Sequence, residues 1–121
     1  MGKTILNLTK LFIIHAKENN ILELDINELR ENFYQMKQVE KYQKLLSSYE
    51  YDENHICLKL EKEIQQLIKD EQISIYKNMI YIYNINLKPE NHYTHEINSL
   101  VDQMITDYIM LNMKKQKSKV G

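Results

Sequence analysis

The chain has 121 residues, of which 43% are hydrophobic and 27% charged, and its net charge is −1. These values predict one globular domain with a modest core, and they exclude an overall basic field that would attract nucleic acid. Because Cys57 is the only cysteine, an intrachain disulfide and a cysteine-based zinc site are also excluded. With no run of 18 apolar residues and no signal-peptide pattern, we expect a cytoplasmic protein without a membrane span.

The first elements in the chain are predicted to be two helices joined by a short strand. Residues 4–18 have apolar side chains at helical spacing, and Asn19-Asn20 favours a helix end after them. Residues 21–25 suit a short strand. Asp25 or Asn27 can cap a second helix over the residues that follow. The apolar faces of the two helices are marked by Ile5, Leu8, Leu11, Phe12, His15 and Ala16, and by Leu29, Phe33 and Met36.

Two further helices are predicted next. The third covers about residues 38–49 and runs into a polar turn over 47–53. Asn54 can cap a fourth helix over about 54–69, which has the most regular apolar stripe in the chain. No glycine closes this fourth helix. The apolar sides of the two helices are formed by Val39, Tyr42, Leu45, Leu46 and Tyr49, and by Ile56, Leu60, Ile64, Leu67 and Ile68.

Residues 73–83 predict a β-hairpin. Two runs of β-branched and aromatic residues, 73–76 and 79–83, are separated by Lys77-Asn78 alone. A loop of two residues fixes the register and places all four isoleucines on one face of the hairpin. Lys77-Asn78 is weaker turn chemistry than Asn-Gly, because lysine resists positive φ. The predicted pairs are Tyr76 with Met79, Ile75 with Ile80, Ser74 with Tyr81, and Ile73 with Ile82.

The last predicted element is a long helix over about residues 93–116. Pro89 separates residues 1–87 from this helix and the basic tail that follows it, but we expect residues 88–121 to belong to the same domain. The apolar stripe of the helix must be buried, either on the first helix of its own chain or on a second chain. The stripe consists of Ile97, Leu100, Val101, Met104, Ile105, Tyr108 and Leu111.

The order of these elements resembles that of winged-helix transcription factors. The resemblance is closest over Leu60–Ile75 and Met79–Tyr83, which look like the recognition helix and wing of bacterial regulators. Gln72 stands where that pattern usually has glycine. The resemblance implies an α+β, mostly helical fold, a winged helix with a two-stranded wing and a long C-terminal helix.

The resemblance also implies how DNA would be bound, with the helix at 54–69 in the major groove and the wing tip on the backbone or minor groove. Charge argues against this use, because residues 52–70 hold five acids and three lysines, and Arg30 is the only arginine of the chain. We expect Glu63 to face outward among the DNA-contacting positions. The implied DNA-binding residues are His55, Lys59, Lys62, Gln66, Lys69, Lys77 and Asn78.

No pattern in the chain predicts a catalytic, metal or cofactor site. His92 and His95 have i,i+3 spacing, but two histidines near a helix start more often form a polar surface. His15 is interpreted as a core-edge residue without an acid or nucleophile beside it in the sequence, and Cys57 as a small buried apolar group. The chain also has no Gly-rich phosphate loop. We therefore expect a protein that is not an enzyme and needs no cofactor.

Two functions follow as hypotheses. The first is a small homodimeric regulator of transcription that binds double-stranded DNA, with the stripe of the last helix as its dimer interface, because two-fold dimers match palindromic half-sites. Packing of the same stripe within one chain is the alternative for that helix, and some of both is expected. The second function is a winged-helix protein-interaction module, such as a phage or plasmid adaptor or inhibitor, that does not bind DNA directly.

Overall fold

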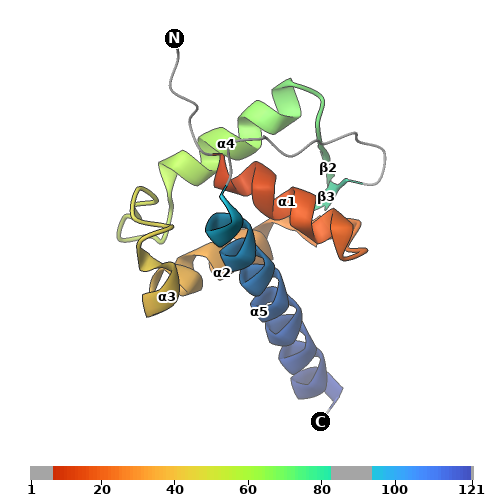
Figure 1. The fold of residues 1–121 in the computed structure, drawn as a ribbon. Helices are drawn as coiled ribbons and strands as arrows, with labels where there is room; N and C mark the ends of the chain where they lie inside the picture. Colours follow the sequence, from red (N-terminus) through yellow and green to blue (C-terminus); the bar gives the residue numbers. More distant parts are fainter. Residues whose placement is uncertain (1–6, 83–93, 121) are drawn as a thin grey trace.

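A computed structural model describes the backbone of residues 7–82 and 94–120, with the side chains up to residue 111. The fold is α+β and mostly helical, as expected, with one small antiparallel sheet. Helix α1 contacts both α4 and α5 and lies between them (Figure 1). The elements run in the order α1 (Leu8–Glu18), β1 (Glu23–Asp25), α2 (Ile26–Lys37), α3 (Glu40–Gln43), α4 (Leu58–Lys69), β2 (Ser74–Tyr76), β3 (Met79–Tyr81) and α5 (His95–Val120).

The C-terminal end of α1 and the start of α2 lie close to where the sequence predicts them, whereas α1 begins at Leu8, four residues later than predicted, and Ile5 lies outside the described residues. Asn20 has φ 63° just after α1, and the N–H of Ile21 donates to the carbonyl oxygen of Ala16 at 2.9 Å. Asparagine tolerates this left-handed conformation, so Asn19-Asn20 ends the helix as predicted. The Asp25 carboxylate accepts the first N–H groups of α2, from Asn27 and Glu28, which confirms Asp25 as the cap.

The predicted helix over 38–49 is mostly wrong, because only α3 is helical in that stretch. Residues 44–48 form turns, in which Tyr49 donates its N–H to Leu46 three residues back. The side chain of Tyr49 is buried in the core, and the Lys37 ammonium binds its carbonyl oxygen. These contacts of Tyr49 hold residues 44–48 in turns in place of the predicted helix. Val39, expected on the inner side, is exposed.

Helix α4 begins later than predicted. The Asp52 carboxylate accepts N–H groups from Asn54 and Ile56, which closes a tight turn, and His55 has φ 62° within it. Asn54 is therefore not the cap, and the helix starts after Cys57. Ile56 lies outside the helix and is 46% exposed, although it was predicted to belong to the apolar stripe.

Helix α4 ends in a Schellman motif without glycine. The N–H of Gln72 donates to Leu67 and that of Glu71 to Ile68, while Glu71 has φ 57°. The left-handed residue is therefore Glu71. The winged-helix pattern has its glycine one residue later, at the position of Gln72. A glutamate in this conformation is strained, because its Cβ crowds the backbone.

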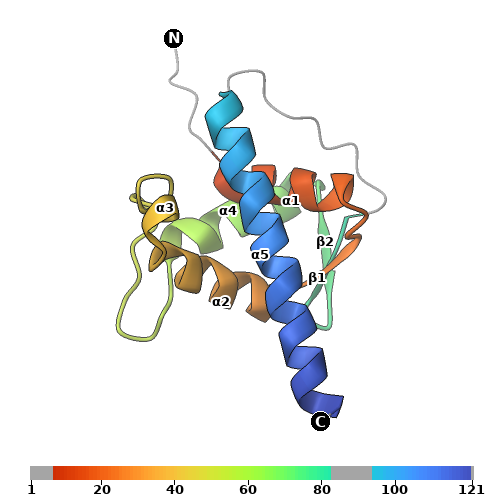
Figure 2. The same cartoon turned by 60° about the horizontal axis from the view of Figure 1, so that its bottom comes forward.

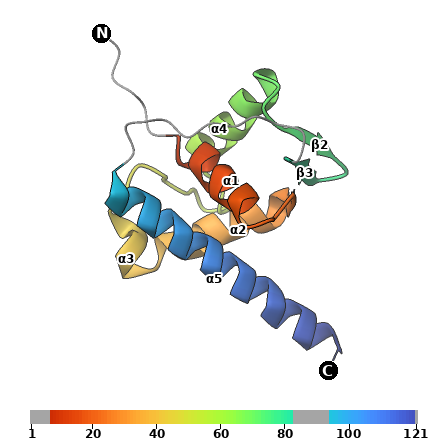
Figure 3. The same cartoon turned by 45° about the vertical axis from the view of Figure 1, so that its right-hand side comes forward.

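The hairpin has the predicted register. Ser74 pairs with Tyr81, Ile75 with Ile80 and Tyr76 with Met79. Lys77 and Asn78 both have positive φ, as a two-residue turn of type I′ requires. Strand β1 pairs antiparallel with β3 and completes a sheet in the order β1-β3-β2. The hairpin and α3 lie at opposite ends of the molecule (Figure 3). Tyr83, predicted in the second strand, lies outside the described residues.

Helix α5 crosses α1 and α2, and its C-terminal end extends past the rest of the molecule (Figure 2). Val101, Met104, Ile105 and Tyr108 are buried in the same core as α1 and α4. These four residues of the predicted dimer interface are therefore already covered within one chain. Ile97, Leu100 and Leu111 are partly buried. None of the described helices is long and apolar enough to cross a membrane.

Candidate nucleic-acid interface

One stripe of α4 points away from the core. It follows the spacing 58, 62, 65 and 69, which places its members on a single face of the helix. Lys62 and Lys69 are exposed there, as is Gln66 beside the stripe, as expected from the sequence. Leu58 and Gln65 were not among the predicted contacts, although the same spacing identifies both. The outward stripe consists of Leu58, Lys62, Gln65 and Lys69.

Glu63 was predicted to face outward, and this is wrong. Its side chain is buried, and its Oε1 atom accepts hydrogen bonds from the hydroxyls of Thr9 at 2.8 Å and Tyr49 at 2.5 Å. The reason is its position between Leu60, Ile64 and Leu67, all on the inner face of α4. We refer to Thr9, Tyr49 and Glu63 as the Glu63 cluster. The cluster joins α1, the loop before α4 and α4 itself.

The Glu63 cluster also sets the protonation of its members. Burial raises the pKa of Glu63, and the hydrogen bonds from Tyr49 and Thr9 offset part of that rise. Burial, followed by the Glu63 charge, raises the pKa of Tyr49. The Tyr49 hydroxyl therefore stays a donor to Glu63, and it accepts the N–H of Leu8 at 3.2 Å. The charge of Glu63 is thus withdrawn from the surface of α4.

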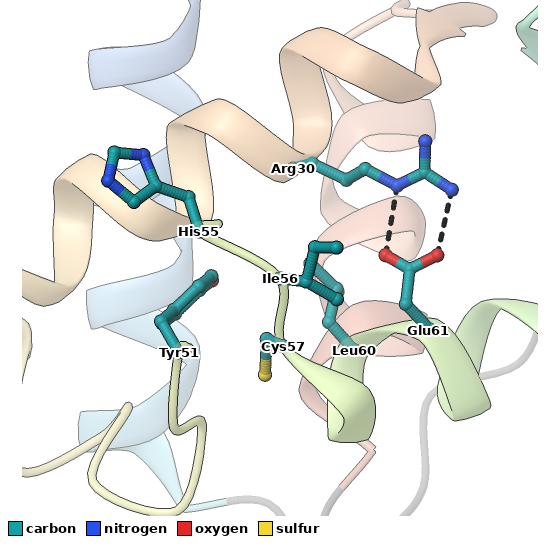
Figure 4. Close-up of a pocket in the computed structure, with 7 residues that line it drawn as sticks. All are labelled: Arg30, Tyr51, His55, Ile56, Cys57, Leu60 and Glu61. Carbon is teal, nitrogen blue, oxygen red and sulfur yellow. Dashed lines mark hydrogen bonds and ion pairs between the residues drawn. The ribbon is translucent and has the colours of Figure 1, made fainter. Parts of the chain in front are cut away.

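Glu61, the other acid of α4, is held by Arg30 of α2. The guanidinium donates from Nε at 2.9 Å and from Nη2 at 2.7 Å to the two carboxylate oxygens (Figure 4). These hydrogen bonds to Glu61 raise the pKa of Arg30 further. The pair borders a pocket of about 290 Å³ at the leading end of α4, which Tyr51, His55, Ile56, Cys57 and Leu60 also line. The negative charge of Glu61 is therefore neutralised within the protein.

Two of the predicted DNA-binding residues are engaged elsewhere. His55 is not on α4, and its ring stacks on Tyr34 with the ring centres 3.9 Å apart. The Lys59 ammonium donates to the Ser48 hydroxyl at 2.7 Å and lies 4.9 Å from the centre of the Tyr49 ring. Both side chains thus support the loop before α4.

The turn of the hairpin forms a second exposed surface. Lys77 and Asn78 are exposed, and the Lys77 ammonium lies 5.4 Å from the centre of the Tyr76 ring. The carbonyl oxygen of Asn78 accepts the N–H of Ile26 at 2.9 Å. The turn is therefore fixed against the start of α2, and Lys77 is its charged group.

Because Glu61 and Glu63 are engaged within the protein, neither contributes negative charge to the outward stripe of α4. The sequence count of five acids and three lysines over 52–70 includes Glu61 and Glu63. With one buried and the other ion-paired, the outward stripe carries Lys62 and Lys69 and no acid. Asp70 lies at the end of the helix, where its carboxylate accepts the Gln66 amide at 3.0 Å. The face that points into solvent is therefore more basic than the sequence indicated.

His15 has polar partners that its sequence neighbours did not indicate. Its Nδ1 lies 2.5 Å from the Asp102 carboxylate, and its Nε2 lies 3.0 Å from the Asn98 amide oxygen, both on α5. An acid beside this histidine was not expected from the sequence. The His15 ring is buried, and its contacts with Asp102 and Asn98 fasten α5 to α1.

Cys57 and the histidines near the start of α5 were the remaining candidates for catalysis or metal binding. Cys57 is buried as predicted, and burial raises the pKa of its thiol. His95 is exposed at the first turn of α5, whereas His92 lies outside the described residues. No group of three or more histidine, cysteine or acidic residues suited to a metal occurs among the side chains that the structure describes.

Comparison with protein-family models, curated proteins and solved structures found no match to this chain.

Proposed function

We propose that the chain is a winged-helix protein that binds double-stranded DNA through α4 and the hairpin turn, and that it regulates transcription without being an enzyme. The element order supports this proposal, since α1, β1, α2, α4 and the hairpin follow one another as in winged-helix proteins. The sheet order β1-β3-β2 places the hairpin beside the start of α2. In this arrangement α4 is the recognition helix and β2–β3 is the wing.

One observation carries the proposal. The two acids in the middle of α4 are both engaged within the protein, since Glu63 is buried in the core and the partly exposed Glu61 forms an ion pair with Arg30. What remains on the outward stripe is a set of lysine, glutamine and leucine side chains. Lysines neutralise phosphates and release counterions, which is the main sequence-independent contribution to DNA affinity. Glutamine and leucine suit the base edges.

The test is the salt dependence of duplex binding. Affinity of the full chain for a duplex DNA, measured by fluorescence anisotropy, should fall steeply between about 50 and 200 mM salt. Changing Lys62 and Lys69 together to glutamate should weaken binding by at least about tenfold, because two attractive phosphate contacts become repulsive. Lys59 is a poor choice for this test, since its ammonium supports Ser48 and Tyr49.

Lys44→Glu provides the matched control. This exposed lysine follows α3 and lines a pocket with the first turn of α5, away from the outward stripe. Lys44→Glu makes the same change in net charge per residue as the substitutions on α4. Because Lys44 lies away from the outward stripe, the affinity of this variant for the duplex should stay close to that of the wild type. Absent duplex binding, or binding that does not respond to salt, would contradict the proposal.

A protein-interaction module is the second candidate, and one observation favours it. Ile56 and Leu58 are 46% and 70% exposed at the leading end of α4. Both line a pocket of about 380 Å³, and Ile56 also lines the pocket beside Arg30. Exposed apolar side chains beside concave surfaces are typical of protein contacts. Under this function, Leu58→Asp should abolish capture of the partner while duplex DNA is not bound at any salt concentration.

A further inference from the structure

The outward stripe of α4 has a composition that restricts which base pairs it can read. We propose that α4 reads A·T base pairs in the major groove, with Gln65 on an adenine and Leu58 on a thymine methyl group. This inference rests on the proposed DNA binding and adds the class of sequence that is bound. It follows from the side chains that are exposed on α4 and from those that are not.

Gln65 supplies the hydrogen-bonding part of the proposal. It is exposed at the middle of the stripe, one turn after Lys62. A glutamine amide both donates and accepts, so it matches the N7 acceptor and N6 donor that adenine presents in the major groove. Gln66 is less suited, because its amide is directed to the Asp70 carboxylate at 3.0 Å.

Leu58 supplies the apolar part of the proposal. It is the first residue of α4 and is 70% exposed, the highest exposure among the large apolar side chains of the described residues. The leading end of a recognition helix is the part that reaches base edges. The thymine methyl group is the apolar feature of the major groove, so burying Leu58 against it removes both from water.

The absence of arginine from this face completes the argument. The commonest specific contact to guanine is made by arginine or lysine, and the planar fork of arginine is the better preorganised of the two. Arg30 is the only arginine, and its donors are directed to Glu61 and to the Asn27 side chain. Lys62 and Lys69 are flexible point charges, which suit phosphates. A·T pairs are therefore the ones that this stripe recognises with its remaining side chains.

The experiment uses the full chain and begins with selection of bound duplexes from a random pool. Bound sequences should be enriched in A·T pairs. In a duplex of the selected sequence, replacing single thymines by deoxyuridine removes the methyl group, and replacing single adenines by 7-deazaadenine removes N7. At one thymine and one adenine, these changes should each weaken wild-type binding by about tenfold.

Matched variants assign each contact. Leu58→Ala should lose its sensitivity to deoxyuridine and keep its sensitivity to 7-deazaadenine, whereas Gln65→Ala should show the reverse. Gln43→Ala, an exposed glutamine on α3, should behave as the wild type. All three positions are exposed, so the variants keep the fold.

Selection of G·C-rich sites, or A·T preference that is insensitive to both base analogues, would overturn this inference. Salt-dependent duplex binding without any sequence preference would overturn it as well and would leave the proposed function standing. If no duplex is bound at low salt, the proposed function and the inference fail together.

Discussion

The Glu63 carboxylate joins three segments of the chain through one buried oxygen atom. Its Oε1 accepts from the Thr9 hydroxyl of α1 and from the Tyr49 hydroxyl of the loop before α4. A buried acceptor of this kind stabilises the fold only while its donors remain in place, and losing the carboxylate would leave the two hydroxyl groups without this acceptor for their protons. Glu63 therefore helps to set the rotation of α4 about its axis, and with it the direction of the outward stripe.

Glu63 should make stability depend on pH. Because burial raises its folded-state pKa, the unfolded chain ionises first, so the free energy of unfolding should fall as pH rises from about 4.5 through the raised pKa. Glu63→Gln has no charge to bury, so this loss should be absent from the variant. Urea denaturation at pH 5 and pH 7.5 measures both. Equal pH dependence of wild type and variant would contradict the prediction.

The burial of a single residue could be predicted from the sequence only where its spacing along a helix or strand decides which face it lies on. Phe33 and Cys57 are buried as expected. The prediction for Glu63 was wrong because its charge favours solvent, whereas its spacing with Leu60 and Leu67 places it on the inner face of α4. The partners of His15 could not be predicted, since Asp102 lies 87 positions away in the chain.

At the scale of the element, the end of α4 is strained where a glycine would relieve the strain. Glu71 adopts φ 57° in the Schellman motif, which is costly for a residue with a Cβ atom. Glu71→Gly should therefore raise the free energy of unfolding by about 0.5–1 kcal/mol, measured by denaturation. Glu71→Ala is the control, since alanine keeps the Cβ atom and should not stabilise.

Local signals predicted the elements well where turn chemistry and pattern agree, as in the hairpin and at Asp25. They failed at the boundaries between 38 and 57. There, Asn54 looks like a cap, but the Asp52 carboxylate closes a turn across it. The buried Tyr49 likewise draws the chain out of a helix after α3. At Asn54 a competing local turn, and at Tyr49 burial in the core, override a helical preference that is worth little by itself.

At the scale of the whole molecule, α1 joins the two halves of the fold. It contacts α4 on one side and α5 on the other, and its Phe12 side chain packs edge-on against Phe33 of α2 and Tyr108 of α5. His15 adds two polar contacts to α5. The apolar stripe of α5 predicted that one face of this helix would be buried. The spacing of its residues does not indicate whether that face packs on its own chain or on a second chain. Most of that stripe packs on its own chain.

We propose that the homodimer expected from the sequence would use another part of α5. Ile109 and Met110 are 36% and 54% exposed, directly after the buried Tyr108. Residues 114–119 hold four lysines and no acid, so two copies aligned in parallel would repel each other. A two-fold crossing centred on Met110 pairs the apolar residues and keeps the basic ends apart.

This arrangement predicts that Met110→Glu converts a dimer to a monomer, because two carboxylates would be buried at the crossing without a partner. Light scattering at high micromolar concentration measures the mass of each form. Val39→Glu, an exposed apolar residue before α3, should leave the mass unchanged. A wild-type chain that is monomeric under these conditions would exclude the dimer, and DNA binding would then involve a single copy on a single half-site. A dimer that survives Met110→Glu would place the interface elsewhere.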